Sequence, residues 1–175
     1  LLLQQPREKS GMAVGYLADC LSKQEADLEI LSANDRLEFD KVHVEVMAPV
    51  QQRDYSSDND ASLVLLVKHP ECRVLLPGDI EREGIEVLFG LHPASEFDVV
   101  MVPHHGSVHS EPELFSEWSR PRFAVVSTGH EMLQDRVLNS YQPIVHQRGG
   151  ELLLTSQSGM IEFRVGAEGL EPVAE

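Results

Sequence analysis

Four short apolar segments constrain the fold of this chain more than any other feature. They are almost continuously apolar, which is typical of strands that are buried on both faces of a sheet. Apolar residues recur at helical spacing over 80–91, 111–118 and 135–147, between and after these segments. This alternation predicts a layered α/β protein with a mixed sheet. The four segments are Leu63–Val67, Val74–Leu76, Phe97–Val102 and Phe123–Ser127.

The flanking sequence predicts further elements and the limits of the domain. Alternating valines over 42–46 predict a half-buried strand, and His69–Glu71 is the expected hairpin turn between the first two buried strands. Pro143 is expected to end the last helix early. The segments 151–155 and 160–165 predict a closing hairpin. We expect one domain over residues 1–166, including a helix over 12–21 and a strand over 27–31, and a C-terminal tail over 167–175.

Charge and composition exclude several classes of function. The 175-residue chain has a net charge of −15, which argues against a broad nucleic-acid surface because phosphate binding depends on Lys and Arg. No apolar run approaches the ~20 residues of a membrane helix, so we expect a soluble domain without a membrane segment. Cys20 and Cys72 are far apart and form no CxxC motif, which leaves them as small apolar side chains or free thiols.

Asp79 follows a buried strand in the sequence Leu75-Leu76-Pro77-Gly78-Asp79. A carboxylate at the end of such a strand is costly unless its charge is compensated, and a metal ion would provide that compensation. The alternative is that Asp79 is the N-cap of a helix that starts at Ile80, since Asp is a favoured cap. Both interpretations are open at this point. Glu81, Glu83 and Glu86 are expected on the solvated face of the same helix.

A second buried strand ends in Pro103-His104-His105-Gly106-Ser107. Imidazole is the commonest metal ligand and a frequent general acid or base near neutral pH. Adjacent side chains on an extended chain point in different directions, so one of the two histidines is expected to face a given site. The alternative is a polar loop without a chemical role. Two strand ends that both carry ligand-type residues favour a shared site, because sites gather where strands end.

Four further residues are weaker candidates for the same site. Asn59 and Asp60 precede the first buried strand and could bind a metal, although both are also common turn residues. His109 follows the Pro-His-His-Gly-Ser motif, and His130 follows the fourth buried strand. Each could reach the same pocket or lie on the surface. The sequence contains no Gly-rich phosphate loop and no serine nucleophile motif.

At Gly78-Asp79 and Pro103-His104-His105-Gly106-Ser107 the sequence resembles the metallo-β-lactamase superfamily. More narrowly, it is similar to the C-terminal hydrolase domain of ComEC-type competence proteins, which carry a stretch like Asn59-Asp60-Ala61-Ser62-Leu63-Val64-Leu65 before these motifs. The resemblance covers roughly Leu28 to Val165. It implies an αββα sandwich with one or two metal ions, zinc or manganese.

The resemblance also implies roles for individual residues. Asp79 takes the position of the bridging carboxylate, and His105 takes the histidine position of the Pro-x-His-Gly motif. His104 lies beside it and would support the ligands. The Asn59 region falls where many relatives place another metal-binding histidine.

The chain also departs from the family pattern. The His-x-His-x-Asp-His motif is absent, and a later Gly-His-Pro is replaced by Glu131-Met132-Leu133-Gln134-Asp135, next to His130. A catalytic zinc site needs about three protein ligands, and Asp79 and His105 make two. We therefore expect a sandwich without its N-terminal portion and an incomplete metal site.

Three functional hypotheses follow. The leading one is the C-terminal part of a ComEC-like, metal-dependent hydrolase that cleaves phosphodiester bonds in DNA during DNA uptake. Its partner would be single-stranded DNA, and the parent protein would have an upstream membrane domain in the bacterial inner membrane. The second is a hydrolase of a small ester, thioester or lactam, in a cytoplasmic protein. The third is a degenerate, metal-free domain with a structural or interaction role.

Overall fold

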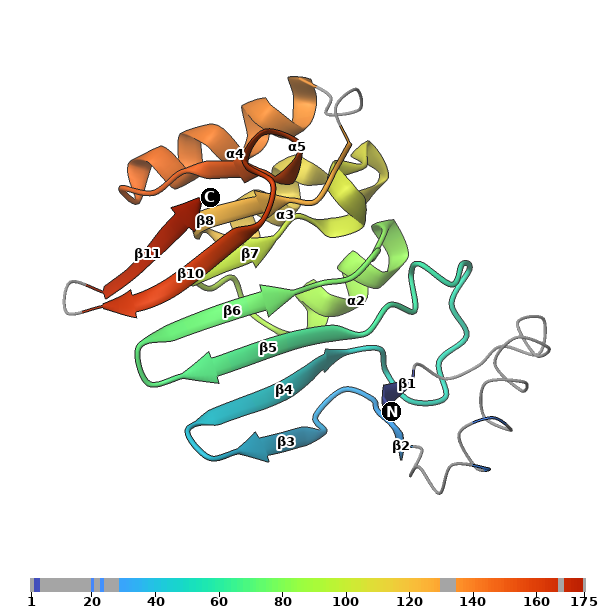
Figure 1. Ribbon diagram of the computed structural model, residues 1–175. Coiled ribbons are helices and arrows are strands. Elements are labelled where there is room, and N and C mark those ends of the chain that lie inside the picture. The colour runs from blue at the N-terminus through green and yellow to red at the C-terminus, as the bar shows by residue number, and fades with distance from the viewer. Residues whose placement is uncertain are drawn as a thin grey trace.

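A seven-stranded mixed sheet forms the centre of the protein in the computed structural model, which describes residues 2–3, 20, 23, 29–129, 135–166 and 169–174 (Figure 1). The strands follow one another in chain order. The first four pair antiparallel, and the pairs β6–β7, β7–β8 and β8–β9 are parallel. The strands are β3 Arg36–Phe39, β4 Val42–Ala48, β5 Val64–His69, β6 Cys72–Leu76, β7 Phe97–Met101, β8 Pro121–Val126 and β9 Leu152–Leu154.

Three helices cover one face of this sheet, and they occupy the predicted places in the chain (Figure 1). They are α2 Arg82–Leu91, α3 Pro112–Ser119 and α4 Asp135–Gln147. The main core lies between them and the strands, where Leu75, Val100 and Ala124 are fully buried against helix residues such as Tyr141. Because side chains alternate along a strand, the neighbours of these residues point to the opposite face.

A two-stranded antiparallel sheet covers part of the opposite face, in front of β7 and β8 in Figure 1. Its strands are β10 Ile161–Gly166 and β11 Gly169–Ala174. Val99, Phe123 and Val125 from the main sheet pack there with Leu170, and the rings of Phe123 and Phe163 lie 5.5 Å apart. The layers are therefore helices, main sheet and small sheet, which confirms the predicted layered α/β architecture.

The C-terminal part corrects two predictions. The predicted hairpin of 151–155 with 160–165 is wrong, because β9 joins the main sheet parallel to β8 and is followed by the short helix α5 Thr155–Ser158. Leu152–Leu154 contacts both cores, which favours a place inside the sheet over a place in a terminal hairpin. The expected tail is also wrong for residues 169–174, since they form β11.

Pro143 does not end α4, which continues to Gln147. Tyr141 and Val145 are fully buried on either side of it, so tertiary packing outweighs the local cost of the proline. The predicted hairpin of β5 and β6 is confirmed, with His69 paired to Cys72.

The N-terminal predictions are tested in part. The helix expected over 12–21 lies almost wholly outside the described residues. The expected strand over 27–31 corresponds to the short β2 Glu29–Ile30, which pairs parallel with β1 Leu2–Leu3. Among the described helices, none has the length and apolar character that crossing a membrane requires.

The loop before β5 caps helix α2 through Asp60. Asp60 is buried, and its Oδ1 accepts hydrogen bonds from the backbone N–H groups of Glu83 (3.0 Å) and Gly84 (3.2 Å). Its Oδ2 accepts a hydrogen bond from the Ser57 hydroxyl at 2.6 Å. The loop can approach this closely because position 84 lacks a side chain: a Cβ there would lie 2.3 Å from the Asp60 carbonyl oxygen.

Gly84→Ala tests this close approach. We expect the substitution to lower the free energy of unfolding by about 1–3 kcal/mol, because the loop backbone must move. Gly90→Ala in the same helix is the control, since nothing lies within 4 Å of its added Cβ. There alanine should raise the stability by up to about 1 kcal/mol through helix propensity. Urea unfolding of both variants measures the difference, and effects of the same sign would contradict the proposed contact.

Asp60→Ala tests the cap itself. Removing the carboxylate leaves the N–H groups of Glu83 and Gly84 without their acceptor, so we expect a loss of about 1–2 kcal/mol in unfolding free energy. Asp60→Asn keeps an acceptor oxygen and should cost less. Asp54→Ala, at an exposed position of the same loop, should change the stability by less than about 0.5 kcal/mol. Equal melting temperatures of the Asp60→Ala and Asp54→Ala variants would rule out a capping role for Asp60.

Candidate metal centre

The ends of β6 and β7 bring the two predicted motifs together. These strands pair in parallel, with Leu75 opposite Val100, so the loops that follow them leave the sheet at the same edge. The backbone N–H of His104 donates a hydrogen bond to the Gly78 carbonyl at 3.1 Å and ties the two loops to each other. Gly78 has a φ of +61° and packs against Ser62, a combination that favours glycine.

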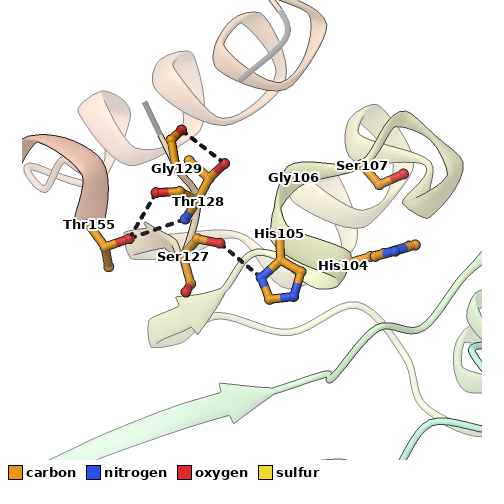
Figure 2. A pocket seen from close by; sticks show the side chains of 8 residues that line it. All are labelled: His104, His105, Gly106, Ser107, Ser127, Thr128, Gly129 and Thr155. Carbon is orange, nitrogen blue, oxygen red and sulfur yellow. Dashed lines mark hydrogen bonds between the residues drawn. The ribbon is translucent and has the colours of Figure 1, made fainter. Parts of the chain in front are cut away.

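The two histidines have left-handed backbone conformations, with φ of 46° at His104 and 55° at His105. Such conformations cost on the order of 1–3 kcal/mol each for residues other than glycine and gather at functional sites. They also separate the imidazoles, whose ring centroids lie 6.4 Å apart. Figure 2 shows His105 turned towards Ser127 and His104 pointing away from it.

His105 is held in a defined orientation. Its Nδ1 lies 2.8 Å from the carbonyl oxygen of Ser127 at the end of β8, which was not among the predicted site residues (Figure 2). A carbonyl can only accept a hydrogen bond, so Nδ1 carries a proton, and in the neutral imidazole Nε2 then has the lone pair. That Nε2 lies 3.7 Å from Asp79 Oδ1. A histidine that gives its other N–H to a backbone carbonyl is the usual arrangement of a metal ligand.

The Asp79–His105 pair fits two positions of a metal site. Two atoms that bind one zinc ion at about 2.0–2.2 Å in a tetrahedral arrangement lie ~3.4 Å apart, which is close to the observed 3.7 Å. The side chains of Asp79 and His105 are 48% and 62% exposed, so both are accessible from solvent. Within the described residues, no group of three or more His, Cys, Asp or Glu side chains is placed to hold a metal ion. The described residues therefore bring two of the predicted ligands together but not a set of three.

Asp79 is not the cap of α2. The helix begins at Arg82, its N-cap residue is Glu81, and the capping hydrogen bonds come from Asp60 across the loop contact. The N-cap interpretation of Asp79 is wrong, because the chain runs for two further residues before the helix starts.

His104 lies in a second polar cluster, on the side of α2. Its Nδ1 is 2.8 Å from Glu81 Oε1, although the two groups are not aligned for a hydrogen bond. The same Glu81 oxygen accepts a hydrogen bond from Asn59 Nδ2 at 3.2 Å. Glu81 is thus half-buried between two loops. The prediction that it lies on a solvated helix face is wrong. Its partners come from distant segments, so no local signal indicates the cluster.

Asp60 and His109 lie apart from the Asp79–His105 pair. Asp60 is engaged with α2 and with Ser57. His109 is exposed and lines a different hollow, beside Ser56, Glu81 and Glu86. His130 lies outside the described residues.

A hollow of about 580 Å³ opens beside His105. It combines both histidines with hydroxyl side chains and two glycines, and Figure 2 shows these residues around it. Among the described residues that line it, none is a Lys, Arg, Asp or Glu, so hydrogen bonds from these residues would hold a ligand there. The lining residues are His104, His105, Gly106, Ser107, Ser127, Thr128, Gly129 and Thr155.

Curated relatives of this chain are competence and recombination proteins. The chain is 28% identical over 137 residues to ComE operon protein 3 of Bacillus subtilis, a match that covers 78% of this chain and 18% of that protein. It is 31% identical over 140 residues to competence protein ComA of Neisseria gonorrhoeae, covering 79% of this chain and 20% of that protein. Recombination protein 2 of Haemophilus influenzae is 33% identical over 90 residues, covering 50% of this chain and 11% of that protein.

No family model matches the chain. A solved structure from Parabacteroides distasonis, named "Putative metal-dependent hydrolase", superposes with a TM-score of 0.47 at 11% identity. The superposition covers 89% of this chain and 74% of the solved chain, and we draw no conclusion from a similarity at this level.

The chain spans about a fifth of the length of the first two relatives. These relatives confirm the resemblance predicted from the Gly-Asp and Pro-His-His-Gly-Ser motifs: over most of its length, the chain is similar to ComEC-type competence proteins.

Proposed function

We propose that this domain supplies two ligands to a metal site that hydrolyses phosphodiester bonds in DNA, within a longer ComEC-like protein. The observation that carries the proposal is the Asp79–His105 pair, in which Nε2 lies 3.7 Å from Asp79 Oδ1. Asp79 would hold the ion or ions through its carboxylate, and His105 would bind through Nε2. The other ligands would come from a different part of the longer protein.

A bound zinc or manganese ion would lower the pKa of its water towards ~7 and stabilise negative charge on the phosphoryl oxygens. The residues of this chain prepare the site for that chemistry. The Ser127 carbonyl keeps the proton on His105 Nδ1, and the Gly78–His104 backbone hydrogen bond holds the two ligand loops in register. The exposure of Asp79 and His105 leaves room for a polymeric substrate to approach.

DNA as the substrate is supported by the relatives, which are named as competence and recombination proteins. The net charge of −15 argues that this domain itself offers no broad DNA-binding surface. Single-stranded DNA would therefore contact the domain only near the metal site and would be held mainly by other parts of the parent protein. We place that parent in the bacterial inner membrane, where it would act during DNA uptake.

A small ester, thioester or lactam is the second candidate substrate. The specific observation in its favour is the same acidic balance, since a small neutral substrate needs no basic surface. The described lining of the hollow beside His105, which is rich in hydroxyl groups, suits such a molecule as well as a phosphodiester.

Metal analysis and nuclease assays test the proposal. The longer protein that contains this chain should bind zinc or manganese and cleave a fluorescent single-stranded DNA. EDTA should abolish cleavage, and adding the metal back should restore it. Asp79→Ala and His105→Ala should each lower metal affinity and cleavage at least about 100-fold, because ligand loss exceeds the ~10–100-fold effect of losing a supporting residue.

His43→Ala, at an exposed position of β4, and Asp54→Ala are the matched controls and should retain both properties. Hydrolysis of p-nitrophenyl acetate without DNA cleavage would favour the small-ester function. Metal content unchanged by Asp79→Ala and His105→Ala would contradict the assignment of these ligands. Absence of metal and of both activities would identify a metal-free domain.

A further inference from the structure

We infer that Thr155 is a positioning residue, which fixes the orientation of His105 through the peptide group between Ser127 and Thr128. The part of this inference that concerns metal binding rests on the proposed function. The part that concerns the orientation of His105 does not.

The peptide group between Ser127 and Thr128 makes one hydrogen bond to His105 and another to Thr155. Its carbonyl, from Ser127, accepts a hydrogen bond from His105 Nδ1–H at 2.8 Å. Its N–H, from Thr128, donates to Thr155 Oγ1 at 3.1 Å. A trans peptide is planar, and its C=O and N–H point in opposite directions. Anchoring the N–H on Thr155 therefore aims the carbonyl at His105, and a rotation of this peptide would break both bonds.

Thr155 reaches this peptide because of the sheet. β9 pairs parallel with β8, with Leu154 opposite Val126, so the residue after β9 lies beside the end of β8. Thr155 Oγ1 also lies 3.4 Å from the carbonyl oxygens of Val126 and Thr128, either of which can accept its proton. Because its own proton goes to one of these carbonyls, the Thr155 hydroxyl oxygen can accept the hydrogen bond from the Thr128 N–H. Each donor between Thr155 and His105 therefore has an acceptor.

The hydrogen bond at Nδ1 of His105 affects its other ring nitrogen, Nε2. In the neutral ring, a proton fixed on Nδ1 leaves a lone pair on Nε2, which lies 3.7 Å from Asp79 Oδ1. Neutral imidazole in water favours the opposite tautomer, with the proton on Nε2, which cannot bind a metal there. The bonds of such a chain also polarise one another, so losing the bond at Thr155 weakens the one at His105. Thr155 would therefore act on the metal ligand without touching it.

Tautomer measurement by ¹⁵N NMR tests the orientation directly. The full chain is studied without metal, at a pH where imidazole is neutral, and the His105 signals are assigned by their loss in His105→Gln. Wild type should show the Nδ1–H tautomer, whereas Thr155→Val and Thr155→Ala should shift His105 towards Nε2–H. Thr155→Ser keeps the hydroxyl and should behave as wild type. Thr128→Val is the matched control, since it removes a hydroxyl from the same hollow and leaves the peptide intact.

Metal titration of the same variants, in the longer protein, provides the second readout. Thr155→Val and Thr155→Ala should weaken zinc or manganese binding by about 10–100-fold, and Thr155→Ser should restore most of it. Backbone NMR spectra establish that each variant is folded. Should Thr155→Val fail to fold, Thr155→Ala carries the comparison with Thr155→Ser.

The two parts of the inference fail in different ways. A wild-type His105 in the Nε2–H form, or one whose tautomer is the same in Thr155→Val, Thr155→Ala and wild type, would overturn the positioning role. A tautomer that shifts in these variants while wild type binds no metal would support the positioning role and contradict the proposed function. A shifted tautomer with unchanged metal affinity would overturn the link between Thr155 and the metal site.

Discussion

Parallel pairing of β6 with β7, and of β7 with β8, is the constraint on which the candidate site depends. Because these strands run in the same direction, their carboxyl ends meet at one edge of the sheet. Asp79, His105 and Ser127 each follow one of the three strands, and this edge brings them together although the chain separates them widely. The hydrogen bond from the His104 N–H to the Gly78 carbonyl then joins the first two loops.

The polar residues at this edge divide into groups with different physical roles. Asp79 and His105 are accessible, and the imidazole is oriented by a backbone carbonyl, as a metal ligand requires. His104 is turned towards Glu81 by the left-handed backbone of the histidine pair. Asp60 is buried and satisfies the start of α2. Similar carboxylates and imidazoles are thus suited to metal binding, to contacts between loops or to helix capping, according to the donors and acceptors around them.

Sequence patterns predicted much of the fold and indicated Asp79 and His105, which the structure brings within 3.7 Å of each other. The buried strands, the three long helices and the β5–β6 turn were predicted because continuous apolar runs and helical spacing report burial directly. Leu152–Leu154 was assigned to a terminal hairpin, since a short apolar run does not reveal its partner. Glu81 was expected in solvent and Asp79 was open to a capping role, because the loop that decides both cases is distant in sequence. Thr155 carried no signal of its own.

The sequence by itself determined which segments are buried and which residues can bind a metal, because hydrophobicity and side-chain chemistry belong to the residues. It also determined the resemblance to ComEC-type proteins, through motifs at two strand ends. Tertiary structure alone decided which of the candidates lie close together and which nitrogen of His105 donates to a backbone carbonyl. Those properties depend on strand order and on hydrogen bonds between residues far apart in the chain, such as the bonds that connect Thr155, the Ser127–Thr128 peptide and His105.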